Sequence, residues 1–218
     1  MKKKLKKIIT LAREKRAAAG KRVMTAIIVA SALILSIGCG GQKASVEAET
    51  EEKSPIHWTE CGYNVGEHGC DISATDQYGN NWSLYDNHGS IVILDFSTTW
   101  CGYCQVAAST AQEFQDKYSD NDLLYVTVLV EDSYGNTPPP QQVISEWSDV
   151  FGISAPVIGG SRDMLLSGDK DGWEVSGWPT FFVLDSDLKI YDIQRGYSDV
   201  NLARIIDSLI LREQSTSP

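Results

Sequence analysis

Two cysteines separated by two residues are the most reactive feature of this 218-residue chain. Cys101 and Cys104 directly follow an apolar run at residues 91–96 and begin a stretch with helical periodicity. A cysteine at a helix start is stabilised as a thiolate by unpaired backbone N–H groups and by the helix dipole. The pattern predicts thiol–disulfide exchange, in which Cys101 attacks a disulfide and Cys104, one turn later and more buried, releases the partner.

A buried strand and a helix are predicted to position this pair. Residues 91–96 are apolar except for Asp95, which is typical of a central strand covered on both faces. Residues 103–118 are expected to be helical, because apolar side chains recur along one face: Val106, Ala107, Ala111, Phe114 and Tyr118. A structural disulfide or half of a metal site is the alternative for the pair, but the chain has no second Cys-x-x-Cys to complete a four-thiolate site.

The segment from Val92 to Cys104 resembles the active-site strand and turn of the thioredoxin superfamily, and it is most similar to the exported, membrane-attached branch related to the TlpA and ResA proteins. The resemblance spans roughly residues 66–211. It implies an α/β three-layer sandwich with a central mixed sheet flanked by helices, an N-terminal hairpin and an insertion before the cis-proline strand. It also implies that Asp95 is a buried acid with a raised pKa, which accepts the proton of Cys104.

A second element of the resemblance is the segment Val175–Thr180, which precedes an apolar strand at residues 181–184. Here Pro179 matches the superfamily's cis-proline, which implies that it faces Cys101 and that the Trp178 backbone pairs with an incoming peptide. An ordinary trans proline at a strand start is the alternative. The expected docking surface comprises Trp100, Gly102, Tyr103, Trp178 and Pro179. Gly-Tyr between the cysteines replaces the Gly-Pro of thioredoxin, so the redox potential stays open.

Charge is divided sharply along the chain. Residues 1–38 carry ten lysines and arginines against one acid, whereas residues 39–218 carry nine against twenty-eight. The acidic balance of the larger part argues against a nucleic-acid partner, because phosphate binding needs a positive surface. The basic part has the layout of a signal peptide, since its apolar run at residues 24–38 is shorter than the roughly 20 residues of a membrane-spanning helix.

Residues 35–39 resemble the lipobox of bacterial lipoproteins, which implies that Cys39 is acylated and anchors the protein to a membrane. Ser36 stands where that motif usually has an apolar residue, and an ordinary cleaved signal is the alternative. The expected location is the bacterial cell envelope, facing the periplasm. The absence of an aspartate after Cys39 favours the outer membrane in a Gram-negative cell.

The predicted organisation has four parts: a signal peptide at 1–38, a lipidated cysteine and acidic tether at 39–57, a thioredoxin-like domain at 58–213 and a tail at 214–218. Within the domain we expect a hairpin at 75–84, strands at 123–130, 155–158 and 189–193, and helices at 141–151 and 199–211.

Five cysteines in an exported chain leave two pairs once Cys39 carries lipid. Cys61 and Cys70 flank a turn-rich stretch and are predicted to form a structural disulfide. A metal site that combines them with His57 and His68 is the alternative. No metal or other cofactor is expected.

Together these features predict a membrane-anchored thiol-disulfide oxidoreductase that acts on thiols and disulfides of exported proteins. We expect it to act as a reductant and to receive its electrons from a membrane or periplasmic donor. A peroxiredoxin-like thiol peroxidase is the enzymatic alternative, because Thr98 stands three residues before Cys101, although Leu94 replaces that motif's proline. A non-catalytic metal- or protein-binding lipoprotein is the other alternative. A copper carrier would need a histidine downstream of the cysteines, and none follows His88.

Overall fold

The computed structural model describes residues 56–216. The predicted signal peptide, Cys39 and most of the predicted tether lie outside the described residues. Within residues 56–216, no helix combines the length and the apolar character that crossing a membrane would require.

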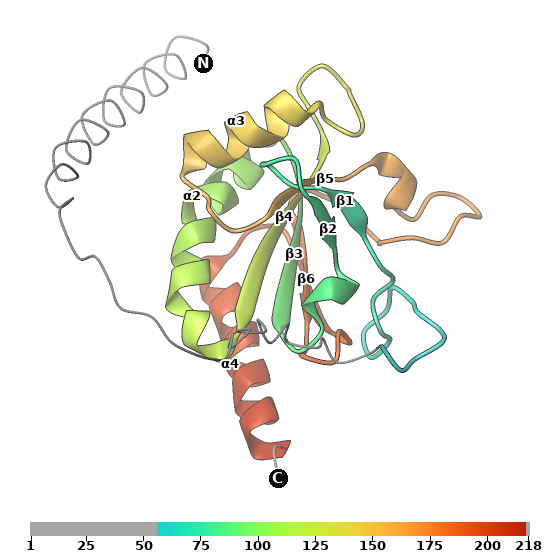
Figure 1. Ribbon diagram of the computed structural model, residues 1–218, viewed down its shortest axis with the longest axis vertical. Helices are drawn as coiled ribbons and strands as arrows, with labels where there is room; N and C mark the ends of the chain where they lie inside the picture. The colour runs from blue at the N-terminus through green and yellow to red at the C-terminus, as the bar shows by residue number, and fades with distance from the viewer. Residues whose placement is uncertain (1–55, 217–218) are drawn as a thin grey trace, which may run out of the picture. The chain divides into compact units, whose positions relative to one another are not determined.

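A mixed sheet of five strands forms the centre of the described fold (Figure 1). The strands, in spatial order, are β5 (Val157–Gly159), β4 (Leu123–Glu131), β3 (Ile91–Thr98), β6 (Thr180–Leu184) and β7 (Ile190–Arg195). β3, β4 and β5 run parallel, whereas β6 is antiparallel to both β3 and β7. Every residue of β3 is buried, as expected for a central strand covered on both faces.

Three helices contribute their buried side chains to the core on one face of the sheet. They are α2 (Gly102–Lys117), α3 (Gln141–Phe151) and α4 (Asp199–Thr216). Ile91 and Ile93 belong to this core, whereas Val92 and Leu94 belong to the core on the opposite face. The alternation follows from the two-residue period of a strand.

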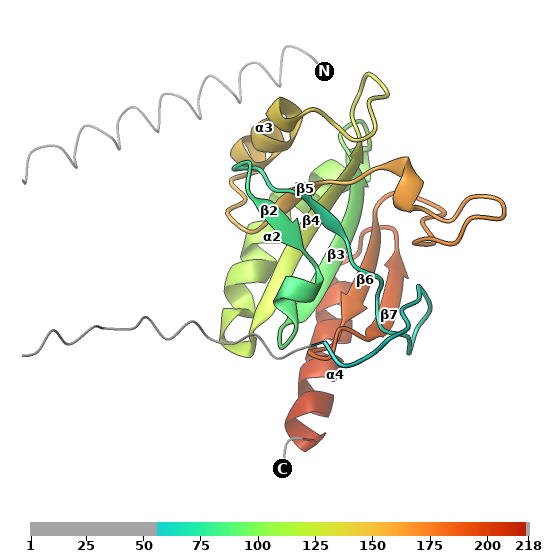
Figure 2. The same ribbon diagram turned by 45° about the vertical axis from the view of Figure 1, so that its right-hand side comes forward.

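The opposite face is covered by the N-terminal hairpin and by the segment between β5 and β6. The hairpin pairs β1 (Ser73–Thr75) with β2 (Asn81–Ser83) and continues into the short 3-10 helix η1 (Tyr85–Asn87). The segment after β5 projects from the fold in both views, where it is drawn in orange (Figure 1, Figure 2). Its Trp173 is buried in the core of this face, against Phe96 of β3 and Phe182 of β6.

The fold is the predicted thioredoxin-like sandwich, a mixed sheet flanked by helices, and the predicted hairpin, strands and helices are present. One detail of the predicted helix face was wrong: Val106 is exposed, and Cys104, Ala107, Ala108, Ala111 and Phe114 are the buried residues of α2. Val106 lies two residues from Cys104, which on a helix of 3.6 residues per turn is nearly the opposite side. α4 also continues to Thr216, past its predicted end at Leu211 and into the predicted tail.

Replacing Trp173 with alanine is expected to lower the free energy of unfolding by about 3–5 kcal/mol, because the cavity left among Tyr63, Phe96 and Phe182 cannot collapse fully. Urea titration at 25 °C measures the loss. Tyr134→Ala, at an exposed aromatic residue, is the control and should change stability by less than about 0.5 kcal/mol. Equal losses in the two variants would contradict the assignment of Trp173 to the core.

Candidate active site

The two reactive cysteines lie where β3 leads into α2. Cys101 is the N-cap residue of α2, with extended backbone angles, and its Sγ accepts a hydrogen bond from the backbone N–H of Cys104 at 3.2 Å. The N–H of Cys101 is in turn donated to the carbonyl of Thr98, the last residue of β3, at 3.4 Å. This arrangement places the Cys101 sulfur at the positive end of the helix dipole, which favours the thiolate.

Both cysteines are free thiols and differ in their access to solvent. Cys101 retains 8% of its exposed surface, whereas Cys104 is fully buried. Cys104 is the more buried of the two, as predicted, and Cys101 itself exposes only a small part of its surface. Of the two sulfurs, Cys101 is therefore the one that a partner sulfur can meet first.

Asp95 is fully buried in the middle of β3. Ser97 donates a hydrogen bond to its Oδ1 at 2.7 Å, and the Tyr125 hydroxyl donates to its Oδ2 at 2.9 Å. Burial raises the pKa of Asp95 to about 7, against the opposing effect of these two hydrogen bonds. A carboxyl group with this pKa exchanges its proton at neutral pH, as a general base requires.

Cys104, the predicted resolving cysteine, is held in its protonated form. Burial raises the pKa of Cys104 well above its ordinary value, and its hydrogen bond with Cys101 and the charge of Asp95 act in the same direction. Cys104 therefore needs a proton acceptor before it can attack a disulfide. Asp95 can serve as that acceptor, because its charge acts on the Cys104 thiol and so places the two groups close together.

The residues predicted to form a docking surface lie at the same edge of the sheet. The register pairs Phe96 of β3 with Thr180 of β6, so the residues after β3 and those before β6 are neighbours. The Trp178–Pro179 peptide bond is cis. The ring of Trp178 stands edge-on to that of Trp100, with the centroids 6.5 Å apart. Trp100 and Tyr103 are exposed.

A groove of about 270 Å³ adjoins Trp178. The lining residues are Arg162, Leu165, Leu166, Ser167, Val175, Ser176, Gly177 and Trp178. The lining of the groove thus mixes apolar side chains with two serines and the guanidinium group of Arg162.

Two charged residues beside the cysteines were not predicted. Glu131, the last residue of β4, accepts a hydrogen bond from the indole N–H of Trp100 at 3.0 Å and forms an ion pair with Arg162. The Arg162 hydrogen bond lowers the pKa of Glu131, so this acid is ionised. Glu131 could have been predicted, because it ends the strand that follows β3 along the chain, and parallel strands end at the same edge of a sheet. No signal in the sequence identified Arg162.

Cys61 and Cys70 lie at the other end of the sheet and are joined by a disulfide. Gly69, within their loop, donates its N–H to the carbonyl of Leu188, just before β7. β7 begins beside the start of β3, because Leu184 pairs with both Ile190 and Val92. The alternative metal site of Cys61 and Cys70 with His57 and His68 is wrong, since the two sulfurs are bonded to each other.

Comparisons with known proteins support this description. Residues 65–193, more than half of the chain, match the AhpC/TSA family. The thioredoxin-like protein YneN of Bacillus subtilis is 24% identical over 63% of this chain and 75% of its own length. The thiol-disulfide oxidoreductase ResA of Geobacillus kaustophilus is 25% identical over 61% of this chain and 70% of its own.

A solved structure shows the same fold. The putative thiol:disulfide interchange protein DsbE of Chlorobium tepidum superposes with a TM-score of 0.53 at 19% identity, covering 68% of this chain and 99% of its own. The family match and the thioredoxin-like fold around a Cys-x-x-Cys motif lead to one conclusion: the chain belongs to the AhpC/TSA family, as a thioredoxin-like thiol-disulfide oxidoreductase.

Proposed function

We propose that this thiol-disulfide oxidoreductase works outside the cytoplasm, anchored to a membrane through acylated Cys39, and reduces disulfides of exported proteins. The observation that carries the proposal is the asymmetry of the cysteine pair: Cys101 caps α2 with a window to solvent, whereas Cys104 is sealed beneath it beside an acid of raised pKa. Such a pair separates the attacking sulfur from the resolving one.

In the first step, the Cys101 thiolate attacks one sulfur of a substrate disulfide. The substrate S–S bond breaks, a mixed disulfide forms with Cys101, and the other substrate sulfur leaves as a thiolate that takes a proton from water. Trp100, Tyr103 and the Trp178–Pro179 pair form the surface on which the substrate docks, with Gly102 between the cysteines leaving room for its backbone.

In the second step, Cys104 gives its proton to Asp95 and attacks the sulfur of Cys101. The substrate leaves fully reduced, and the enzyme retains the two-electron oxidation as a Cys101–Cys104 disulfide. A membrane or periplasmic dithiol donor then returns the pair to the reduced state and becomes oxidised itself.

The location rests on the sequence before the described residues. The basic segment, the short apolar run and the lipobox-like residues 35–39 support export and acylation. Two glycines rather than an aspartate follow Cys39, which supports the outer membrane if the cell is Gram-negative.

Peroxide reduction is the second candidate, because the chain belongs to a family that carries the name AhpC/TSA. Thr98, the residue that would correspond to a peroxidase motif, is fully buried, and Leu94 stands in place of that motif's proline. These residues favour disulfide reduction.

The roles of the two cysteines predict opposite trapping behaviour. Cys104→Ser should accumulate mixed disulfides with exported proteins, because the second step is blocked, whereas Cys101→Ser should form none. Non-reducing gels and mass spectrometry of the full-length variants measure this. Equal trapping by both variants, or by neither, would contradict the assignment.

Asp95→Asn should slow formation of the Cys101–Cys104 disulfide from the mixed disulfide by about 10²-fold or more. The wild-type rate should rise with pH through about 7, as Asp95 loses its proton, and the variant should lack this rise. Stopped-flow tryptophan fluorescence measures both rates. Ser97→Ala is the matched control: it removes a hydrogen bond that lowers the pKa of Asp95, so its midpoint should move to higher pH. A midpoint near 7 that survives in Asp95→Asn would assign it to another group.

The same acid should be visible in the stability of the fold. Because the native state raises the pKa of Asp95 from 3.8 to about 7, it binds the proton more tightly than the unfolded chain does. The contribution of Asp95 to the free energy of unfolding is therefore fully present below about pH 4 and is lost as the pH rises through about 7. The loss is about 4 kcal/mol at most. Urea titrations at pH 4 and pH 8 should show that loss in the wild type and not in Asp95→Asn. Parallel losses in both proteins would refute it.

A further inference from the structure

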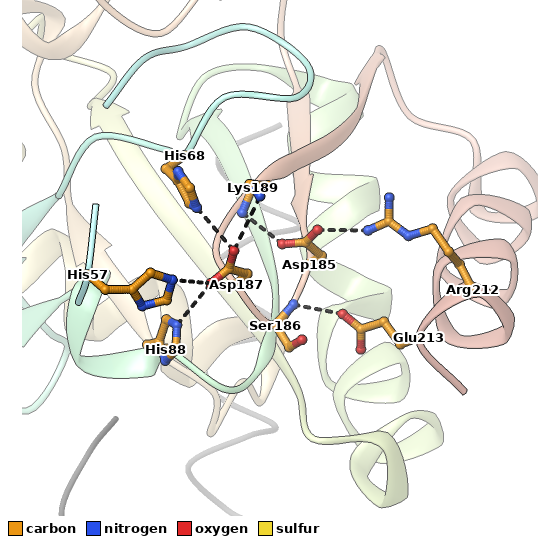
Figure 3. Close-up of polar contacts among 9 residues, drawn as sticks. All are labelled: His57, His68, His88, Asp185, Ser186, Asp187, Lys189, Arg212 and Glu213. Carbon is orange, nitrogen blue, oxygen red and sulfur yellow. Dashed lines mark hydrogen bonds and ion pairs between the residues drawn. The ribbon is translucent and has the colours of Figure 1, made fainter. Parts of the chain in front are cut away.

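Three histidines, all that the chain contains, meet at one carboxylate (Figure 3). The Nε2 atoms of His57 and His88 lie 3.7 and 3.3 Å from Oδ1 of Asp187, and Nε2 of His68 lies 3.1 Å from Oδ2. Asp187 belongs to the turn between β6 and β7, and His88 precedes β3. The cluster therefore lies at the end of the sheet opposite the reactive cysteines.

The ligand atoms are spaced as a small metal ion requires. One atom each from His57, His88 and Asp187 lies within 4.8 Å of the others. A tetrahedral zinc ion, with bonds of about 2.0–2.2 Å, holds its ligand atoms about 3.4 Å apart. The two nitrogen–oxygen separations, 3.3 and 3.7 Å, already meet this value. The His57 side chain is 67% exposed, so its ring is free to close the remaining gap.

Neighbouring side chains hold His88 and Asp187 in place. Trp58 stacks on the ring of His68, with the centroids 4.0 Å apart, and packs against His88 at 5.6 Å. His68 and Lys189 both contact Oδ2 of Asp187, which leaves Oδ1 directed at His57 and His88. Outer contacts of this kind fix the orientation of a ligating group. The His88 side chain is only 10% exposed, so it cannot turn into solvent.

We propose that His57, His88 and Asp187 bind one zinc ion, with a water molecule as the fourth ligand and His68 as a positioning residue for Asp187. Two imidazoles and a carboxylate suit zinc, and three protein ligands leave one position open. The three ligands come from segments far apart in the sequence: the residues before the hairpin, the loop before β3 and the β6–β7 turn. The ion thus ties the start of the described chain to the end of the sheet.

Zinc binding to the full-length protein tests the proposal. All the proteins compared also carry Cys101→Ser and Cys104→Ser, so that these thiols cannot chelate the ion, and metal-free protein is dialysed against micromolar Zn²⁺. We expect one ion per chain by elemental analysis. His57→Ala and Asp187→Asn should each weaken binding by tenfold or more, and His68→Gln by about tenfold. Glu60→Gln, which removes an exposed carboxylate from the same segment, should bind like the wild type.

Two further measurements distinguish zinc bound by His57, His88 and Asp187 from zinc bound elsewhere on the protein. Co²⁺ in place of Zn²⁺ should give visible bands without the thiolate charge-transfer band that cysteine ligands produce. Zn²⁺ at a hundredfold excess over its Kd should raise the Tm by about 5–10 °C, and this shift should disappear in His57→Ala. Because His57 is exposed, that variant should fold normally, which circular dichroism checks. Absence of Zn²⁺ binding, or equal binding by wild type, His57→Ala and Asp187→Asn, would overturn the proposal.

Discussion

The proposed chemistry depends on burying a carboxylic acid, Asp95, with no cation among the described residues to compensate its charge. Asp95 lies in a strand whose residues are all buried, and its hydrogen-bond donors are two neutral hydroxyls. A fully paired acid would stay ionised and a solvated one would titrate far below neutrality, so neither could exchange protons at pH 7. The fold tolerates the cost of burial because β3 is held by a parallel neighbour on one side and an antiparallel neighbour on the other.

The acid and the cysteine pair form one unit because one short segment joins them. Only five residues separate Asp95 from Cys101, and over that distance the chain leaves β3, turns and enters α2. The helix start stabilises one sulfur, and the strand places the acid beneath the other. The predicted docking residue Trp178 comes from a distant part of the chain, just before β6. The pairing of β6 with β3 brings it near Trp100. Local sequence thus supplies the reactive groups, and tertiary pairing supplies the surface around them.

This division explains what could be predicted from the sequence. The Cys-x-x-Cys turn, Asp95 and the strand before them were recognisable because their signals are local and contiguous. Val106 was misplaced because the true buried face of α2 is mostly alanine, a residue that carries little hydrophobic signal. Arg162 and Glu131 meet across 31 residues, and His68 and Asp187 across 119. No periodicity encodes such contacts, since they depend on how strands pair and where loops return.

The chain enters the described fold beside Asp187, at the end of the sheet where β3 begins, and Cys101 stands just beyond the end where β3 finishes. Eight residues of extended backbone separate these ends by roughly 26 Å. The first described residues and the nucleophilic sulfur therefore lie at opposite ends of the domain, so a contact made at the chain's entry leaves the face around Cys101 uncovered.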